Sequence, residues 1–219
     1  MGRRTGIFVS LEGGEGSGKT TQGSRIVAFL RSLGREVLET REPGGTRAGE
    51  LIRDVLLHSV SSLCARTELA LYLASRAQLV TELIQPALAR GVDVVCDRYA
   101  DSSTAYQGGG RDLGIEFVEK MNDWATGSLA PDITFFFDVA PATGLERRSG
   151  RSGGEKLDRI EREALGFHEK VRATYLELAR RHPERFRVIA ADQPEEDVWR
   201  EVQTALGLKL AGSPPGGIV

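Results

Sequence analysis

Cysteine, long apolar runs and net charge are all scarce in this 219-residue sequence. Its two cysteines, Cys64 and Cys96, lack the paired spacing of a disulfide framework or a zinc site. We therefore expect two reduced thiols and a cytoplasmic protein. No segment approaches the roughly 18 apolar residues of a membrane span, and we expect no signal peptide and no membrane partner.

The charge balance gives no indication of a nucleic-acid partner. The net charge of −2 comes from 29 basic and 31 acidic residues, so the chain has no global positive field. Of the basic residues, 24 are arginine and 5 are lysine. Guanidinium groups match phosphate oxygens with two parallel hydrogen bonds, which makes an arginine-lined anion site one explanation. Coding bias explains the total number of arginines more simply. The position of each arginine in the chain therefore has to indicate whether it belongs to an anion site.

Apolar strand and helix patterns alternate along the whole chain. The predicted strands span 6–11, 35–40, 92–97, 132–139 and 185–191. The predicted helices span 19–33, 47–58, 67–90, 101–107, 115–125, 142–149, 158–181 and 195–207. This alternation predicts an α/β fold with three layers, in which helices flank a five-stranded parallel sheet. The carboxyl ends of such strands share one edge of the sheet, where ligands bind.

The chain shows no internal repeat and no domain boundary, so we expect a single domain over 1–209. The Pro/Gly-rich tail at 210–219 is expected to be disordered. A polar segment, RRSGRSGGEK, interrupts the helical pattern, and we expect a mobile insert at 148–156 rather than a linker.

The stretch GGEGSGKT, from Gly13 to Thr20, matches the G-x-x-x-x-G-K-[ST] phosphate loop. It follows an apolar strand and opens a helix, which is the context that supports the match. Backbone amides would hold the β-phosphate of ATP, Lys19 would bridge the β- and γ-phosphates, and Thr20 would bind Mg²⁺. The expected ATP-binding residues here are Gly13, Gly14, Glu15, Gly16, Ser17, Gly18, Lys19, Thr20 and Thr21. The fold is then expected to be that of the P-loop NTPases.

A phosphate loop alone leaves three classes open: a hydrolysing motor or switch, a small-molecule kinase, and a nucleotide-gated binding module. The N-K-x-D and D-x-x-G strings of a GTPase switch are absent from the sequence. A motor usually ends an apolar strand with an acidic pair, whereas this strand ends in Asp97 and continues with Arg98 and Tyr99.

Charged side chains gather at the predicted ligand edge. Asp97 can hold the water shell of Mg²⁺ or orient a nucleophile, and Arg98 beside it suits a second phosphate. Arg41 ends the second strand at the same edge. Tyr72 and Arg76 are four residues apart and share a helix face, which suits a nucleobase near a phosphate. Taken alone, that last pair is more typical of ordinary helix packing.

Several longer strings carry a resemblance to a known family. They are EGGEGSGKTTQ, TREPGGT, LYLASRAQLV, CDRYADSSTAYQGGGR, PDITFFFDV and LDRIE. On these strings the sequence resembles the bacterial thymidylate kinases over residues 6–207. The resemblance implies transfer of the ATP γ-phosphate to dTMP, giving dTDP, with Mg²⁺.

The resemblance also implies roles for single residues. Glu15 would face the 3′-hydroxyl of the acceptor, and Tyr72 stands where the family usually stacks a Phe on thymine. Arg76 and Gln107 match thymine readers, and Tyr106 matches a residue that excludes a ribose hydroxyl. Arg53 and Arg98 match the clamp on the acceptor phosphate. The expected dTMP site is Glu15, Arg41, Pro43, Arg53, Tyr72, Arg76, Arg98, Ser102, Ser103, Tyr106 and Gln107.

The resemblance also implies that RRSGRSGGEK is a lid, at about 147–157. The phosphate loop itself has no arginine, and some members of the family supply the catalytic arginine from the lid. Arg148 and Arg151 are the candidates here, and Arg159 just beyond the lid is a further phosphate contact to consider. Gln193 matches the loop beside the ATP base. The expected catalytic residues are Lys19, Asp97, Arg98, Arg148 and Arg151; the expected metal ligands are Thr20 and Asp97.

Two alternatives stay open beside this reading. A deoxynucleoside kinase would need a base for a hydroxyl acceptor but no anion clamp. A non-catalytic ATP-dependent regulatory protein would keep the loop and lose the catalytic residues. Finally, the helices at 67–90 and 115–125 offer more apolar surface than one sheet face needs, which together with the resemblance implies a homodimer.

Overall fold

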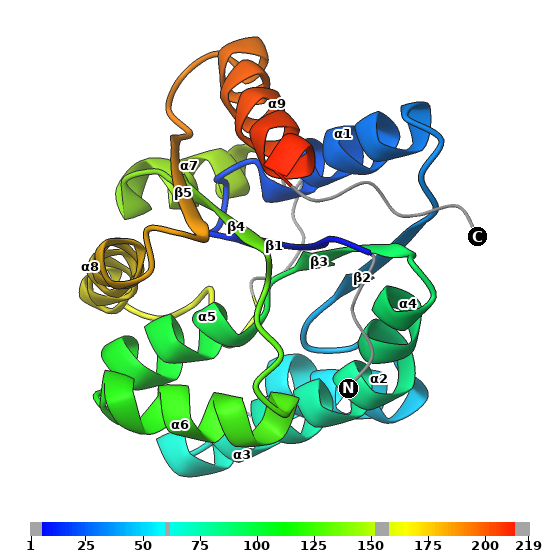
Figure 1. The fold of residues 1–219 in the computed structure, drawn as a ribbon. Helices are drawn as coiled ribbons and strands as arrows, with labels where there is room; N and C mark the ends of the chain where they lie inside the picture. The colour runs from blue at the N-terminus through cyan, green and yellow to red at the C-terminus, as the bar shows by residue number, and fades with distance from the viewer. Residues whose placement is uncertain (1–5, 60–61, 152–157, 213–219) are drawn as a thin grey trace.

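The computed structural model describes residues 6–59, 62–151 and 158–212, and at its centre lies a five-stranded sheet (Figure 1). The strands are β1 (Phe8–Glu12), β2 (Val37–Arg41), β3 (Asp93–Asp97), β4 (Ile133–Asp138) and β5 (Phe186–Ala190). They pair in the order β2-β3-β1-β4-β5, and all four pairings are parallel. Helices cover both faces, which confirms the predicted α/β architecture.

Alternating side chains of the strands pack against different helices. On one face, Val9 and Leu11 of β1 pack in a core with α1 (Lys19–Ser32) and α9 (Glu195–Gly212). On the other face, Phe8 packs with Leu79 and Leu88, from the helical stretch that follows β2. This period of two is the geometry of a strand covered on both sides, and it explains why β1 is buried along its whole length.

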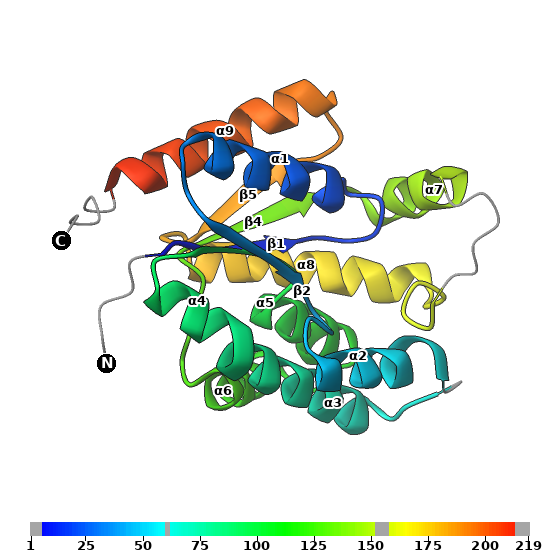
Figure 2. The ribbon, with the colours of Figure 1, turned by 90° about the vertical axis from the view of Figure 1, so that its right-hand side faces the viewer.

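The helices under the second face are partly wound with wider π-helical turns. α2 (Arg47–Asp54) runs into a π-helical turn at Val55–Ser59, and α3 (Ala65–Leu79) continues through Val80–Ile84 into α4 (Gln85–Ala89). α5 (Ala100–Ser103) continues as a π-helical segment, Thr104–Gly110, so this helix is longer than expected. α6 (Ile115–Thr126) lies beside α3 in both Figure 1 and Figure 2. In the described part of the chain, no helix is long and apolar enough to cross a membrane.

Two predicted boundaries were wrong. α8 (Leu165–Arg181) begins seven residues later than expected, because Asp158 Oδ1 accepts the backbone N–H groups of Ile160 and Glu161 and forms a turn instead. α9 extends to Gly212, so residues 210–212 of the expected disordered tail are helical. Residues 152–157 of the expected lid and 213–219 of the tail lie outside the described residues, while residues 147–151 end α7 (Pro141–Arg151).

The carboxyl ends of the strands bring the phosphate loop and α7 to one edge of the sheet (Figure 2). The two segments touch where both lack a side chain. A Cβ atom added to Gly16 would collide with the carbonyl oxygen of Gly144, and one added to Gly144 would collide with that of Glu15. Gly16 also has a φ of 65°, which favours glycine. The loop and α7 therefore lie in direct backbone contact.

Candidate active site

The phosphate loop is held in shape by its own lysine. Lys19 Nζ donates to the carbonyl oxygens of Gly13 (2.9 Å) and Gly14 (2.8 Å), and Ser17 Oγ donates to Gly14 as well. The side chain of Lys19 is buried, and burial lowers its pKa. The ammonium group thus lies within the loop, where its hydrogen bonds can be exchanged for phosphate oxygens.

The carboxylate of Glu15 does not make this loop repel anions. Burial by itself raises the pKa of Glu15, but the positive charges of Lys19 and Arg98 outweigh it and lower the pKa to about 2. Arg98 Nη2 donates to Glu15 Oε1 at 2.7 Å, and the charge of Arg148 acts in the same direction. Glu15 is therefore ionised and surrounded by cations.

Asp97 and Arg98 end β3 beside the loop. The backbone of Arg98 is left-handed, with a φ of 68°, and its N–H donates to Leu11 O of β1. Its guanidinium carbon lies 5.2 Å from the centre of the Tyr106 ring. Asp97 Oδ1 is buried and has no hydrogen-bond partner within the described residues. A buried carboxylate oxygen in this state fits a hydrated cation.

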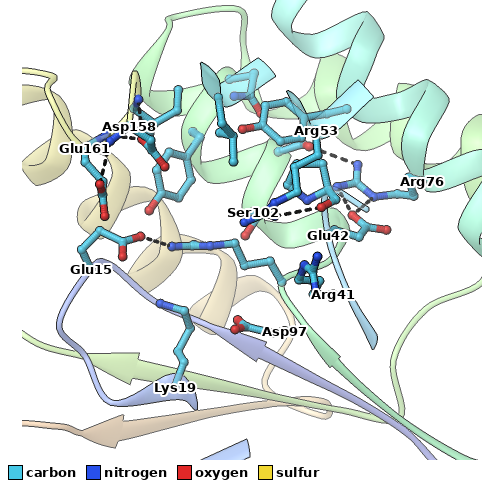
Figure 3. A pocket seen from close by; sticks show the side chains of 18 of the residues that line it. Glu15, Lys19, Arg41, Glu42, Arg53, Arg76, Asp97, Ser102, Asp158 and Glu161 are labelled. Carbon is cyan, nitrogen blue, oxygen red and sulfur yellow. Dashed lines mark hydrogen bonds and ion pairs between the residues drawn. The ribbon is translucent and has the colours of Figure 1, made fainter. Parts of the chain in front are cut away.

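A cleft of about 610 Å³ opens along this edge of the sheet. Figure 3 shows Glu15 and Lys19 at one end and Arg53, Arg76 and Glu42 at the other. All eleven residues of the expected dTMP site line it, as do Lys19, Thr20, Asp97 and Arg148. The cleft also has lining residues that the sequence did not indicate: Glu42, Leu57, His58, Asp158, Ile160 and Glu161. Glu42 stands in the REPGGT string, and Asp158 and Glu161 stand in the LDRIE string. Their place in these strings was the signal by which the sequence could have indicated them as site residues.

Arg76 is the most completely bound side chain of the cleft wall. It is 1% exposed. Nε and Nη2 contact Glu42, Nη1 donates to Ser103 and Asn122, and Nη2 donates to Tyr99 O. Five contacts therefore occupy the five N–H groups of the guanidinium, and any base it reads has to share or replace one of them.

The arginines in and just beyond the expected lid differ in the groups that they contact. Arg148 Nε donates to Glu161 Oε1 at 2.9 Å, which links α7 to the turn before α8. The backbone of Arg151 ends α7, and its side chain lies outside what the structure describes. Arg159 donates to Leu56 O and pairs with Glu68, rather than with a group of the phosphate loop.

Gln193, the residue expected beside the ATP base, donates hydrogen bonds to Ala190 O and Glu201 and does not line this cleft.

Glu12, the first residue of the EGGEGSGKTTQ string, supports the floor of the site, and no role was predicted for it. Its carboxylate accepts hydrogen bonds from Ser102 Oγ (2.6 Å), Tyr175 OH (2.8 Å), Ser10 Oγ and Tyr99 N. Burial, followed by the negative charge of Asp101, raises its pKa to about 7. Three of these donors lie 87 to 163 residues away in the chain, so the string that contains Glu12 could not reveal them.

Comparisons with known proteins agree with this geometry. The thymidylate kinase family model matches residues 11–202. The chain belongs to the thymidylate kinase family. It is 51% identical to the curated thymidylate kinase of Desulfosudis oleivorans, over 91% of this chain and 96% of the relative. It is 46% identical to that of Deinococcus radiodurans, over 92% and 96%.

A solved structure supports the same assignment. The crystal structure of the thymidylate kinase from Ehrlichia chaffeensis superposes with a TM-score of 0.75 at 30% identity, covering 92% of this chain and 98% of that one. The resemblance found from the sequence strings is thereby confirmed, and the fold is that of a P-loop kinase.

Proposed function

We propose that this chain transfers the γ-phosphate of ATP to dTMP and releases dTDP and ADP. The observation that supports it most is one continuous cleft that joins the phosphate loop at Lys19 to the guanidinium groups of Arg41, Arg53 and Arg98. Two nucleotides bound at its two ends would meet with their phosphates in line. The acceptor phosphate is itself the nucleophile, so this reaction needs positioning and charge stabilisation but no general base.

Magnesium is part of the proposal. Thr20 and Asp97 would hold it, mostly through its water shell and the ATP phosphates, because Mg²⁺ retains several waters in such sites. When bound, the ion neutralises charge that develops on the transferred phosphoryl group. The buried, partnerless oxygen of Asp97 supports this assignment. Gly13 to Thr21 would supply the amides that hold the ATP phosphates, and Gln193 would lie near the ATP base.

The far end of the cleft fits a pyrimidine deoxynucleotide. Tyr72 would stack on the base, and burial raises the pKa of its phenol, so the ring stays neutral. Gln107 and Arg76 would read the edge of the base. Tyr106 would occupy the space of a ribose 2′-hydroxyl, and Glu15 would accept a hydrogen bond from the 3′-hydroxyl.

The lid arginines complete the catalytic residues. Arg148 already lies close enough to the loop to lower the pKa of Glu15. When the lid closes over ATP, Arg148 would exchange its contact with Glu161 for a contact with the transferred phosphoryl group. Its positive charge would then stabilise the negative charge of that group in the transition state. Arg151 is the second candidate for this role.

We also propose a cytoplasmic homodimer that uses α3 and α6. Phe117 and Trp124 of α6 are 52% and 76% exposed and lie seven residues apart, on one face of the helix. α3 packs against the neighbouring side of α6, through Val118 and Ala125, and the two helices lie side by side in Figure 1. Sedimentation should give about twice the 23.8 kDa of one chain. A single 23.8 kDa species at micromolar concentration would remove the dimer from the proposal.

The activity is tested by coupled ADP release with dTMP, dUMP, dGMP, dAMP and thymidine as acceptors. We expect dTMP to give the highest kcat/KM. A preference for a purine monophosphate would overturn the assignment, and turnover of thymidine but not dTMP would indicate a deoxynucleoside kinase. Failure of single-turnover product formation with dTMP and Mg-ATP would favour the non-catalytic regulatory protein.

A further inference from the structure

Glu68 of α3 lies behind the wall of the cleft and has no exposed side-chain surface. Its carboxylate accepts hydrogen bonds from three side chains. Gln107 Nε2 donates to Oε1 at 2.8 Å, Arg111 Nε and Nη2 donate at 3.1 and 3.2 Å, and Arg159 Nη1 pairs with Oε2 at 2.6 Å. Of these residues, only Gln107 lines the cleft. Gln107 is therefore the hydrogen-bond partner through which Glu68 reaches the cleft.

The charge of Glu68 fixes which way the Gln107 amide faces. Burial by itself raises the pKa of Glu68, but hydrogen bonds from Arg111 and Gln107 and the charge of Arg111 outweigh burial and lower the pKa. An ionised carboxylate can only accept hydrogen bonds, so it must face the NH₂ group of the amide. The oxygen of Gln107 is then directed away from Glu68. Gln107 Oε1 is buried and has no hydrogen-bond partner within the described residues.

A lone acceptor in the wall of a base site distinguishes between pyrimidines. Thymine and uracil carry an N–H at ring position 3, which can donate to Gln107 Oε1. Cytosine carries an acceptor there, so two acceptors would face each other. A buried polar group left without its partner is strongly unfavourable, which is how such sites reject an analogue that lacks one donor.

We propose that Glu68 is a positioning residue that sets this site for imide bases, by holding the Gln107 amide with its oxygen toward ring position 3. The inference rests on the proposed function, in which the base binds beside Gln107. It goes further because Glu68 would determine specificity without touching the substrate.

A purely structural role for Glu68 is the alternative, and the chain offers a matched control. Arg111 also pairs with Glu163, at 2.7 Å. Glu163 does not contact Gln107 in the interactions that the structure describes. Glu163→Gln therefore loosens the same arginine while leaving the Glu68–Gln107 hydrogen bond in place.

The experiment compares wild type, Glu68→Gln and Glu163→Gln with dTMP and its 3-deaza analogue, in which C–H replaces the N–H. We expect wild type to favour dTMP by about 10- to 100-fold in kcat/KM, as for one unsatisfied buried group. In Glu68→Gln the amide of Gln107 can turn over, so this preference should fall at least about fivefold, mainly through KM for dTMP. Relative activity on 5-methyl-dCMP should rise. Glu163→Gln should keep the wild-type ratio.

The outcomes separate the inference from the proposed function. If wild type does not phosphorylate dTMP, both are wrong. If it does, and Glu68→Gln keeps the wild-type ratio within twofold or Glu163→Gln loses it equally, only the role of Glu68 is wrong. Should Glu68→Gln not fold, Glu68→Asp keeps the charge for the two arginines but withdraws it from Gln107 by one methylene. That variant must also lower the ratio, and an unchanged ratio overturns the inference.

Discussion

The two ends of the cleft handle charge differently. At the base end, carboxylates and arginines pair within the protein: Arg76 with Glu42, and Arg111 and Arg159 with Glu68. At the phosphate end, Lys19, Arg98 and Arg148 all act on the carboxylate of Glu15, and these cations lie beside the loop that would hold the ATP phosphates. The base end is a preorganised wall, whereas the phosphate end holds charge that nucleotide phosphates would neutralise. We expect substitutions to affect mainly stability at the base end and mainly activity at the phosphate end.

The largest effect is expected from Lys19→Met. It removes the cation from the phosphate loop and should lower kcat/KM by about 10³-fold or more, or about 4 kcal/mol. Because burial lowers the pKa of Lys19, the charged form is disfavoured in the fold, and the melting temperature should stay level or rise. Steady-state kinetics and thermal unfolding check both parts. A large loss of stability would contradict the proposed contrast between the two ends.

Arg76→Leu tests the base end. It leaves the buried carboxylate of Glu42 without its cation, and we expect a loss of about 3 kcal/mol in the free energy of unfolding. The double variant Arg76→Leu with Glu42→Leu removes both charges and should regain most of that loss. Urea denaturation measures both variants. If the single variant loses less than about 1 kcal/mol, the pair does not organise this wall.

The phosphate loop could be predicted from the sequence because its chemistry is local. Consecutive backbone amides from Gly13 to Thr20 form the site, so one short string specifies it. The strings around Arg98 and Gln107 likewise indicated the cleft. The roles of Glu12 and Glu68 could not be found in this way, because most of their partners lie 39 to 163 residues away and only the fold brings them together. The helix boundary at 158 failed for a different, local reason, since Asp158 Oδ1 accepts the backbone N–H groups of Ile160 and Glu161 and a turn replaces the first helical turns.

Glu12 of β1, which accepts a hydrogen bond from the cleft residue Ser102, should give stability a pH dependence. Its folded pKa of about 7 lies above the ordinary value of 4.5, so its contribution is complete below pH 4.5 and is lost as pH rises through 7. That loss is roughly 2 kcal/mol for a coupled buried group. In Glu12→Gln it should be absent, so the variant should gain on wild type between pH 5 and pH 8. Parallel stability curves for the two proteins would show that Glu12 does not titrate in this range.

The smallest effect concerns how the phosphate end is joined to the lid helix. Gly144→Ala places a methyl group against the carbonyl oxygen of Glu15, and α7 has to move away from the loop. We expect a lower kcat/KM for ATP, by an amount that corresponds to about 1–2 kcal/mol in activation free energy, because the added methyl group forces backbone shifts. The KM for dTMP should change less than that for ATP, since Glu15 is the one residue of the expected dTMP site that this substitution touches.

Gly166→Ala of α8 is the matched control for that substitution. A Cβ atom at Gly166 meets no atom within 4 Å, and the change should stabilise the helix by about 0.5–1 kcal/mol without altering kinetics. If both variants reduce activity equally, the effect of Gly144→Ala comes from a general change in the helices. If only Gly144→Ala does so, and through ATP alone, then the backbone contact between α7 and the loop sets the geometry of the phosphate end independently of the base end.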